Sequence, residues 1–133
     1  MEDIFYRQMP HSLEAEQSVL GSMLIDANCV KDVMEQLRPD DFYLKQNREI
    51  FETIAHMFVY SQPVDGVTVA SEMEKNGLYT DATRPYLLQL MEVTPTSANV
   101  GEYVKIVRDK ALMRQVATAA ANITAMVQEG GAS

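Results

Sequence analysis

The sequence predicts an all-α protein, in which a compact head of about five to six helices precedes one long projecting helix. Three observations support this fold class. Apolar residues recur every three to four positions through most of the chain, capping residues and prolines divide that pattern into short segments, and no alternating run of strand length occurs. The stretch from 99 to 128 contains no such break, so it predicts a single helix of roughly 45 Å.

Three parts of the chain follow from this pattern. We expect the helical head in residues 1–97, the long helix in residues 98–129 and a flexible end in residues 130–133. Gly130 and Gly131 are expected to end the long helix, because glycine is a poor helix former. At its start, the spacing between Asn99 and Glu102 predicts a capping box.

The first half of the head contains two predicted helices and a turn. Ser12 is the predicted N-cap of a helix from Leu13 to about Ile25, and a second helix must stop before Pro39. The residues that follow, including Asp40 and Asp41, form a turn that places Phe42 in the core. The two aspartates are therefore interpreted as turn caps rather than as an acid and base pair.

Three short helices complete the head. The third helix ends near Ser61, before a proline. Asp65 is the predicted N-cap of a fourth helix, which ends at Gly77 because glycine readily takes the left-handed conformation of a C-cap. Its valines also fit a strand. Pro85 lies in the first turn of a fifth helix, which ends at Thr94.

The far part of the long helix extends beyond any small head and needs an explanation. Residues 116 to 127 carry no formal charge, and five alanines in this stretch leave a smooth surface. One reading is a surface helix of high helix propensity. The other is a packing seam for a second helix, supplied either by a later part of the chain or by a second subunit.

Composition limits the partners and the compartment. The formal net charge of -8 and the pI near 4.6 disfavour binding to phosphate backbones. The basic residues Lys105, Arg108, Lys110 and Arg114 cluster on the long helix, where we interpret them as a solvated or salt-bridging face. A single cysteine, Cys29, and the lack of a signal peptide or an apolar run of membrane-spanning length predict a soluble, cytoplasmic protein.

The residues offer little chemistry of their own. His11 and His56 lie far apart in sequence and have no partner at a metal-ligand spacing, and no phosphate-binding loop is present. We therefore expect no catalytic residue, no metal site and no cofactor site in this chain. From the residues alone, the chain is predicted to be an acidic helical interaction module.

Four stretches closely resemble signatures of the N-terminal domain of DnaB-type bacterial replicative helicases. They lie in the order and spacing of that family: PHSLEAEQSVLG at 10–21, PDDFY at 39–43, PVDGVTV at 63–69 and TPTSANVGEYVKIVRD at 94–109. The sequence departs from the family where a Gly-Gly pair usually precedes the Tyr-Leu dipeptide, since residues 82–85 here read ATRP. The turn at that point is the part of the resemblance least supported by the residues.

The resemblance implies a collar domain of a hexameric ring. In that family, helical hairpins pair subunits into dimers, and three dimers close the ring. The long helix of this chain would be the first half of such a hairpin, and the second half is absent. The collar also docks the C-terminal domain of primase. A RecA-like domain, also absent here, would bind ATP and Mg²⁺ and unwind DNA in the 5' to 3' direction. This fragment itself is expected to bind DNA little or not at all and to contact no membrane.

The resemblance and the long helix together suggest two sets of site residues. The oligomer interface is expected at Val116, Ala120, Ile123 and Val127, and the primase contact at Glu14, Tyr86, Arg114 and Ile123. Two of these have competing roles, because Tyr86 also suits a ring in the core of the head and Glu14 suits the positive end of its own helix dipole.

Three other classes of protein remain as alternatives. The helicase-binding domain of a primase resembles this head, but it lies at the C-terminus of a primase, whereas the motifs here begin directly after the first nine residues. A small helical DNA-binding regulator requires a basic recognition helix, which the charge of -8 disfavours. An enzyme that uses scattered carboxylates requires a pocket that no residue spacing predicts.

Overall fold

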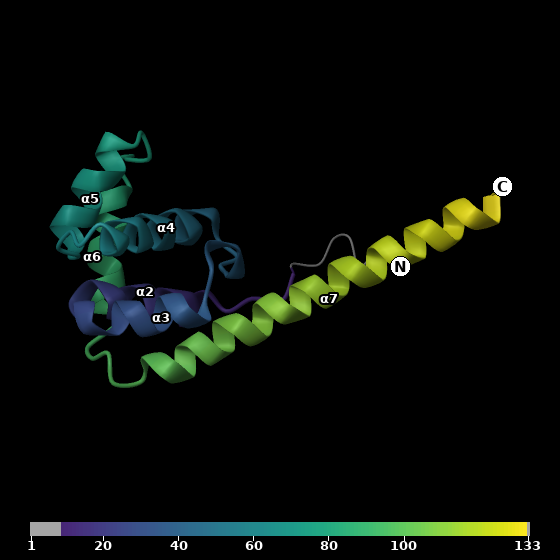
Figure 1. Ribbon diagram of the computed structural model, residues 1–133, viewed down its shortest axis with the longest axis horizontal. Coiled ribbons are helices and arrows are strands. Elements are labelled where there is room, and N and C mark those ends of the chain that lie inside the picture. The colour runs from purple at the N-terminus through teal and green to yellow at the C-terminus, as the bar shows by residue number, and fades with distance from the viewer. Residues whose placement is uncertain (1–8, 133) are drawn as a thin grey trace.

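The computed structural model describes residues 9–132, and this part is all-helical (Figure 1). Residues 1–8 and 133, which belong to the predicted head and the predicted flexible end, lie outside the described residues. The elements are α2 (Leu13–Ile25), the 3-10 turn η1 (Ala27–Cys29), α3 (Val30–Gln36), the 3-10 turn η2 (Pro39–Asp41), α4 (Lys45–Val59), α5 (Gly66–Lys75), α6 (Thr83–Glu92) and α7 (Val100–Ala132). The predicted fold class is confirmed.

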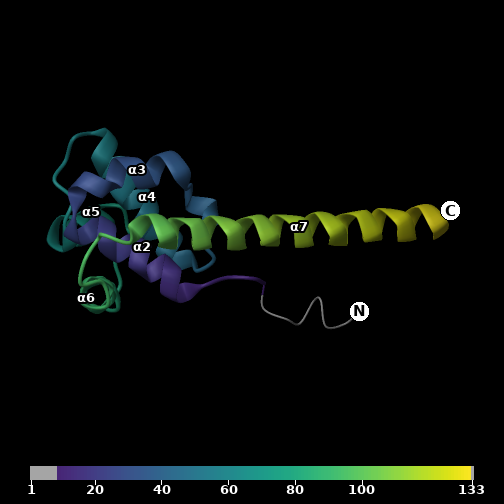
Figure 2. The same cartoon turned by 90° about the horizontal axis from the view of Figure 1, so that it is seen from below.

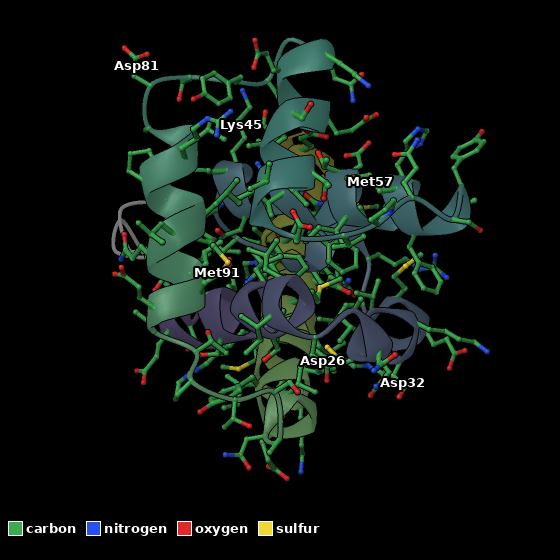
Figure 3. The ribbon with its side chains drawn as sticks, turned by 90° about the vertical axis from the view of Figure 1, so that its left-hand side faces the viewer. Asp26, Asp32, Lys45, Met57, Asp81 and Met91 are labelled. Carbon is green, nitrogen blue, oxygen red and sulfur yellow. The ribbon has the colours of Figure 1, made fainter. Side chains whose placement is uncertain are left out.

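The helix α2 lies at the centre of the head and packs against α4, α6 and α7. Val19, Leu20 and Met23 on α2 are fully buried. In the end-on view of Figure 3, the charged side chains of Asp32 and Asp81 lie at the periphery of the head. Because α2 is covered on several sides, its buried residues are not confined to one stripe, and even Ser22 is inaccessible to solvent.

Local capping signals place the helix ends where the sequence predicts them. The Ser12 hydroxyl accepts a hydrogen bond from the Ala15 amide at 3.2 Å. Asp65 and Thr68 form a reciprocal capping box at the start of α5, with both bonds at 2.9 Å. Gly77 follows α5 with a φ of 75°, the left-handed conformation expected of it. The valine-rich fourth segment is therefore a helix and not a strand.

The turn at η2 is also as predicted. Phe42 is buried, and its ring centroid lies 4.9 Å from that of Phe51. The carboxylate of Asp41 accepts a hydrogen bond from the Arg38 amide at 2.8 Å, so it caps the turn. Residues 42–44 connect η2 to the start of α4.

Two predictions about the ends of the long helix are wrong. The helix does not end at Gly130 but continues through Gly131 to Ala132, because each further residue adds a backbone hydrogen bond that offsets the low helix propensity of glycine. At the other end, Asn99 accepts from the amides of Glu102 and Tyr103 through its carbonyl oxygen, at 3.1 and 3.4 Å. Within residues 9–132, its side chain makes no capping bond, because the backbone already occupies these donors.

Gly21, in the first of the four motifs, lies where α2 comes very close to the end of α6. A Cβ at Gly21 would overlap with the hydroxyl of Thr94 and the carbonyl oxygen of Leu90. Thr94 is itself buried, and its hydroxyl donates to Leu90 at 2.8 Å. The absence of a side chain at position 21 therefore lets α2 and the end of α6 pack backbone to backbone.

A buried carboxylate connects α2 to the start of α4. Glu16 is only 1% exposed. Its Oε2 accepts from the Tyr43 amide at 2.8 Å, and its Oε1 accepts from Asn47 Nδ2 at 2.9 Å and from the Leu44 amide at 3.4 Å. The carboxylate therefore lies at the positive end of the α4 dipole and accepts from the two amides directly before the helix.

The same connection continues to α6. Asn47 Oδ1 accepts from the hydroxyl of Tyr86 at 2.5 Å. Three side chains from α2, α4 and α6 thus form one chain of hydrogen bonds, which we call the Glu16 network (Glu16, Asn47 and Tyr86). All three helices are held in register by directional bonds as well as by apolar contact.

We expect Glu16→Gln to lower the free energy of unfolding by about 2–3 kcal/mol, because the new amide group would face amide donors and leave them unpaired. Urea unfolding followed by circular dichroism measures the effect. Glu14→Gln is the matched control on the same turn of α2, where the side chain is exposed, and should change stability by less than about 0.5 kcal/mol. Equal effects of the two substitutions would contradict a structural role for the Glu16 network.

Candidate functional site

The helix α7 belongs to the head in its first half and projects from it in its second half (Figures 1 and 2). Val104, Val107 and Ala111 are buried against the head. From Val116 onward, most side chains of α7 are exposed. With 33 residues, the helix is about 50 Å long, and most of its described side chains beyond Arg114 are exposed.

The exposed part of α7 carries a regular apolar stripe. Its members recur at alternating intervals of three and four residues, the a and d spacing of a heptad, and we call it the arm seam: Met113, Val116, Ala120, Ile123 and Val127. Ile123 is 61% exposed and Val127 is 69% exposed. At 3.6 residues per turn, the seam lies roughly opposite the face of α7 that packs on the head. Among the described residues, the side chains of the seam are exposed and lie on the side of α7 away from the head.

All four residues predicted for the oligomer interface lie on the arm seam. They are exposed, as an interface residue of the isolated chain must be. The sequence reasoning omitted Met113, which extends the seam toward the head by one step and is also exposed. The interval of three residues between Met113 and Val116 was the signal that could have identified it.

Arg114 marks the point where α7 leaves the head. Its Nη1 donates to the carbonyl oxygen of Pro10 at 2.8 Å, and its Nη2 donates to that of Asp41 at 2.7 Å. The guanidinium carbon lies 5.6 Å from the ring centroid of Tyr43, which stacks on His11 with centroids 4.1 Å apart. We call these groups the Arg114 junction. Arg114 therefore ties α7 to the start of α2 and to η2.

The residues predicted to contact primase do not form one cluster. Glu14, Tyr86 and Ile123 lie on three different helices, and within residues 9–132 no hydrogen bond or ring contact joins any two of the four predicted residues. Glu14 and Ile123 are exposed. Tyr86 is half-buried and bonded to Asn47, and Arg114 uses its terminal nitrogens within the fold.

The environment of Tyr86 supports its role inside the head. Burial raises the pKa of its hydroxyl, although hydrogen bonds with Gln17 and Asn47 lower the pKa and partly oppose that shift. The neighbouring charge of Glu16 raises it further. At neutral pH the hydroxyl is protonated, as its donation to Asn47 requires.

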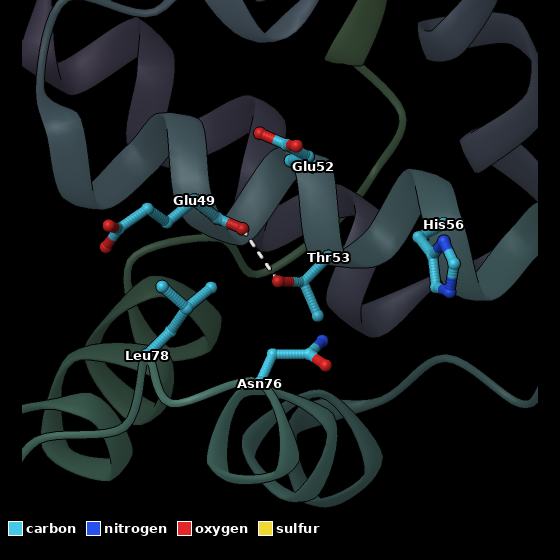
Figure 4. Close-up of a pocket in the computed structure, with 6 residues that line it drawn as sticks. All are labelled: Glu49, Glu52, Thr53, His56, Asn76 and Leu78. Carbon is cyan, nitrogen blue, oxygen red and sulfur yellow. Dashed lines mark hydrogen bonds between the residues drawn. The ribbon is translucent and has the colours of Figure 1, made fainter.

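A hollow between α4 and the end of α5 brings acidic and histidine side chains near one another. It measures about 460 Å³, and Figure 4 shows Glu49, Glu52 and His56 among its lining residues. The two carboxylates point apart, and the Thr53 hydroxyl donates to the carbonyl oxygen of Glu49 at 2.7 Å. Within residues 9–132, no group of three or more His, Cys, Asp or Glu could hold a metal ion.

In the same part of the chain, none of the helices has the length and apolar character needed to cross a membrane.

Cys29 lies half-buried at the end of η1. Burial raises the pKa of its thiol to about 11, and the nearby charges of Asp26 and Asp32 act in the same direction. The thiol is therefore protonated at neutral pH and a poor nucleophile.

Alkylation of Cys29 by iodoacetamide should be about 100-fold slower at pH 8 than that of a thiol with the ordinary pKa of 9.0, because the pKa of about 11 leaves correspondingly less thiolate. The rate should rise about tenfold for each pH unit from 7 to 10. Mass spectrometry measures it, and the same chain unfolded in urea is the control. Since the folded state favours the neutral thiol, this group's contribution to stability is present below pH 9 and lost as the pH rises toward 11. A plateau in the folded rate near pH 9 would contradict the shift.

The fold is a compact helical head with a projecting helix, and that helix carries an exposed apolar stripe. The chain belongs to the DnaB-like helicase N-terminal domain family, whose sequence model matches residues 8–109.

The relatives and solved structures support the same family over most of the chain. The replicative DNA helicases DnaB of Mycobacterium leprae and Leifsonia xyli are 42% and 40% identical to it over 95% and 90% of its length. This chain spans only 20% and 26% of those relatives. The crystal structure of the N-terminal domain of DnaB helicase from Mycobacterium tuberculosis is similar with a TM-score of 0.85 and 42% identity, covering 94% of this chain and 85% of that one.

A more distant structure shows the same fold. The N-terminal domain of DnaB helicase from Helicobacter pylori, studied with its interactions with primase, is 21% identical and has a TM-score of 0.76. The similarity covers 86% of this chain and 90% of that one. The resemblance predicted from the four motifs is confirmed by these comparisons.

Proposed function

We propose that this chain is the collar domain of a replicative DNA helicase, in which the arm seam pairs subunits and the head and arm dock primase. The exposed arm seam is the observation that carries this proposal. A second hairpin helix and a RecA-like domain outside this chain would complete the protein. That domain would bind ATP and Mg²⁺ and drive 5' to 3' unwinding, so the role of this chain is architectural.

The chemistry of the arm suits helix pairing. The residues of the seam are aliphatic and exposed, and alanines nearby allow a second helix to approach closely. Exposed apolar stripes of this kind mark interaction sites. Heptad spacing favours a partner helix nearly parallel or antiparallel to α7. Three dimers formed in this way would close the ring.

The arm also carries a second apolar stripe beside the seam. Leu112, Ala119 and Met126 recur at seven-residue intervals and are exposed. At 3.6 residues per turn, they lie roughly 80° around the helix from the seam. Two adjacent stripes accommodate two helical partners, as a hairpin helix and a helix of a second subunit would require.

The proposal for primase contact rests chiefly on the two exposed residues. Glu14 and Ile123 are accessible to a partner, and the Helicobacter pylori relative was studied with its interactions with primase. Tyr86 and Arg114 act differently, because the Glu16 network and the Arg114 junction use their polar groups. They would influence docking mainly by fixing the shape of the head and the direction of the arm. With its charge of -8, this chain would contribute little DNA binding.

Light scattering during size-exclusion chromatography tests the seam with two alanines on opposite faces of α7. Wild type should form a dimer or a larger assembly. Ala120→Glu should convert it to a monomer, because the substitution places a charge in the seam, which must lose water on pairing. Ala125→Glu, about 160° around the helix from the centre of the seam, is the matched control and should leave the assembly intact. A strictly monomeric wild type, or equal effects of both substitutions, would contradict self-association through the seam.

Isothermal titration with the C-terminal domain of the cognate primase tests the docking surface. Glu14→Ala and Ile123→Ala should each weaken binding about tenfold or more, as expected for interface residues of importance. Neither should change the melting temperature of the chain by more than a few degrees, because both side chains are exposed. Glu35→Ala, at another exposed acidic position, is the control. Unchanged affinity in both variants would place the primase elsewhere.

A further inference from the structure

A hollow on the head lies between the start of α5 and α6, on elements distinct from the arm. It measures about 390 Å³ and is lined chiefly by Gly66, Val67, Arg84, Leu87, Leu88 and Met91. Val67 is 69% exposed and Leu88 is 53% exposed. Two aliphatic side chains are therefore exposed at a hollow whose volume lies within the range of ligand-binding clefts. We call this hollow the α5–α6 groove.

The groove has a fixed floor. Met91 extends from α6 toward the interior of the head (Figure 3), and a Cβ at Gly66 would come within 2.8 Å of its terminal carbon. The start of α5 and the end of α6 thus meet closely at this point. Leu87 belongs to the core and Met91 packs against it, so the floor of the groove is continuous with the core of the head.

Arg84 is the positively charged residue of the groove. Its Nε donates to the hydroxyl of Tyr79 at 3.0 Å, and its guanidinium carbon lies 5.8 Å from the Tyr79 ring centroid. These contacts orient the side chain, while its two terminal amino groups make no hydrogen bond to any residue in 9–132. The carboxylate of Asp65, also at the groove, accepts from the Thr68 amide as a helix cap. An oriented guanidinium with free terminal groups suits two-point binding of a carboxylate.

The spacing of these groups indicates the form of the ligand. Arg84 and Leu88 lie one turn apart on α6, so they are neighbours on one face of that helix. A second helix packed along α6 would contact Leu88 with an aliphatic residue and Arg84 with an acidic residue. These two residues of the second helix would also be one turn apart. Because this protein has a net charge of -8, general electrostatics repel an acidic partner, and a local match to Arg84 is needed to hold one.

We propose that the α5–α6 groove binds an amphipathic helix of a partner protein, with an aliphatic anchor between Val67 and Leu88 and a carboxylate on Arg84. This is the helix-in-groove mode of recognition, in which anchors recur at intervals of three or four residues. The groove lies on the head and shares no residue with the arm seam. A collar domain would thus recruit this partner independently of subunit pairing and of the residues proposed for primase contact on α2 and α7.

The test uses two synthetic helical peptides that differ at one position. Both carry Leu at one position of an alanine-rich host, and four residues later one carries Glu and the other Lys. Fluorescence anisotropy should show at least tenfold tighter binding of the Glu peptide to the wild-type chain. Amide shifts in ¹⁵N NMR spectra should concentrate at residues 65–67 and 84–91. Arg84→Glu should reverse the preference, and Leu88→Gln should weaken both peptides.

Matched variants distinguish binding in this groove from binding at a second surface of the chain. Lys31→Glu makes the same change of charge at an exposed site on α3 and should leave the preference intact. Ala120→Glu, which targets the arm seam, should bind the Glu peptide as wild type does, so failure of the proposed assembly would not affect this result. Equal binding of both peptides, shifts that map to α7, or no saturable binding at millimolar peptide would each overturn the proposal. Shifts in the groove that appear without peptide and vanish on dilution would also overturn it, because a second copy of the chain would then be the occupant.

Discussion

The buried carboxylate of Glu16 is the interaction on which the arrangement of the head depends. A charge that is only 1% exposed is tolerated in a core when its oxygens are bonded, and the start of α4 supplies the required donors. Apolar packing alone is non-directional and would allow α2, α4 and α6 to slide past one another. The Glu16 network removes that freedom, because the bonds to Asn47 and from Asn47 to Tyr86 exist in only one register.

A second polar feature fixes the direction of the arm. In the Arg114 junction, two carbonyl oxygens from segments far apart in sequence, Pro10 and Asp41, accept from one guanidinium. The planar fork of arginine makes this geometry specific. Since Val104 and Ala111 pack the preceding turns onto the head, the junction sets where α7 separates from it and which face then points away. The arm seam is exposed as a direct consequence of that orientation.

The sequence predicted most features that depend on neighbouring residues, apart from the two ends of α7, and missed those that join distant ones. Ser12, Asp65 and Gly77 act within a few residues of their position, so their roles could be inferred from spacing. Four of the five residues of the seam could be grouped from spacing for the same reason, because they all lie on one helix, whereas their role as an interface stays a prediction. The partners of Glu16 lie 27 to 31 residues away, and Arg114 bonds across 104 residues to Pro10. No periodic pattern encodes such contacts.

Polar and apolar residues have separate roles in the head and in the arm, so the proposed pairing through the arm would not weaken the head. The bonds that position the helices lie in the Glu16 network and the Arg114 junction, whereas the residues of the seam beyond Arg114 are exposed. Substitutions in the seam are therefore expected to leave the fold intact, whereas substitutions at Tyr86 or Arg114 would alter the fold first. Because Arg114 holds both α7 and η2, a partner that shifts η2 would also shift the direction of the arm. The position of η2 and the direction of α7 are in this way connected through a single side chain.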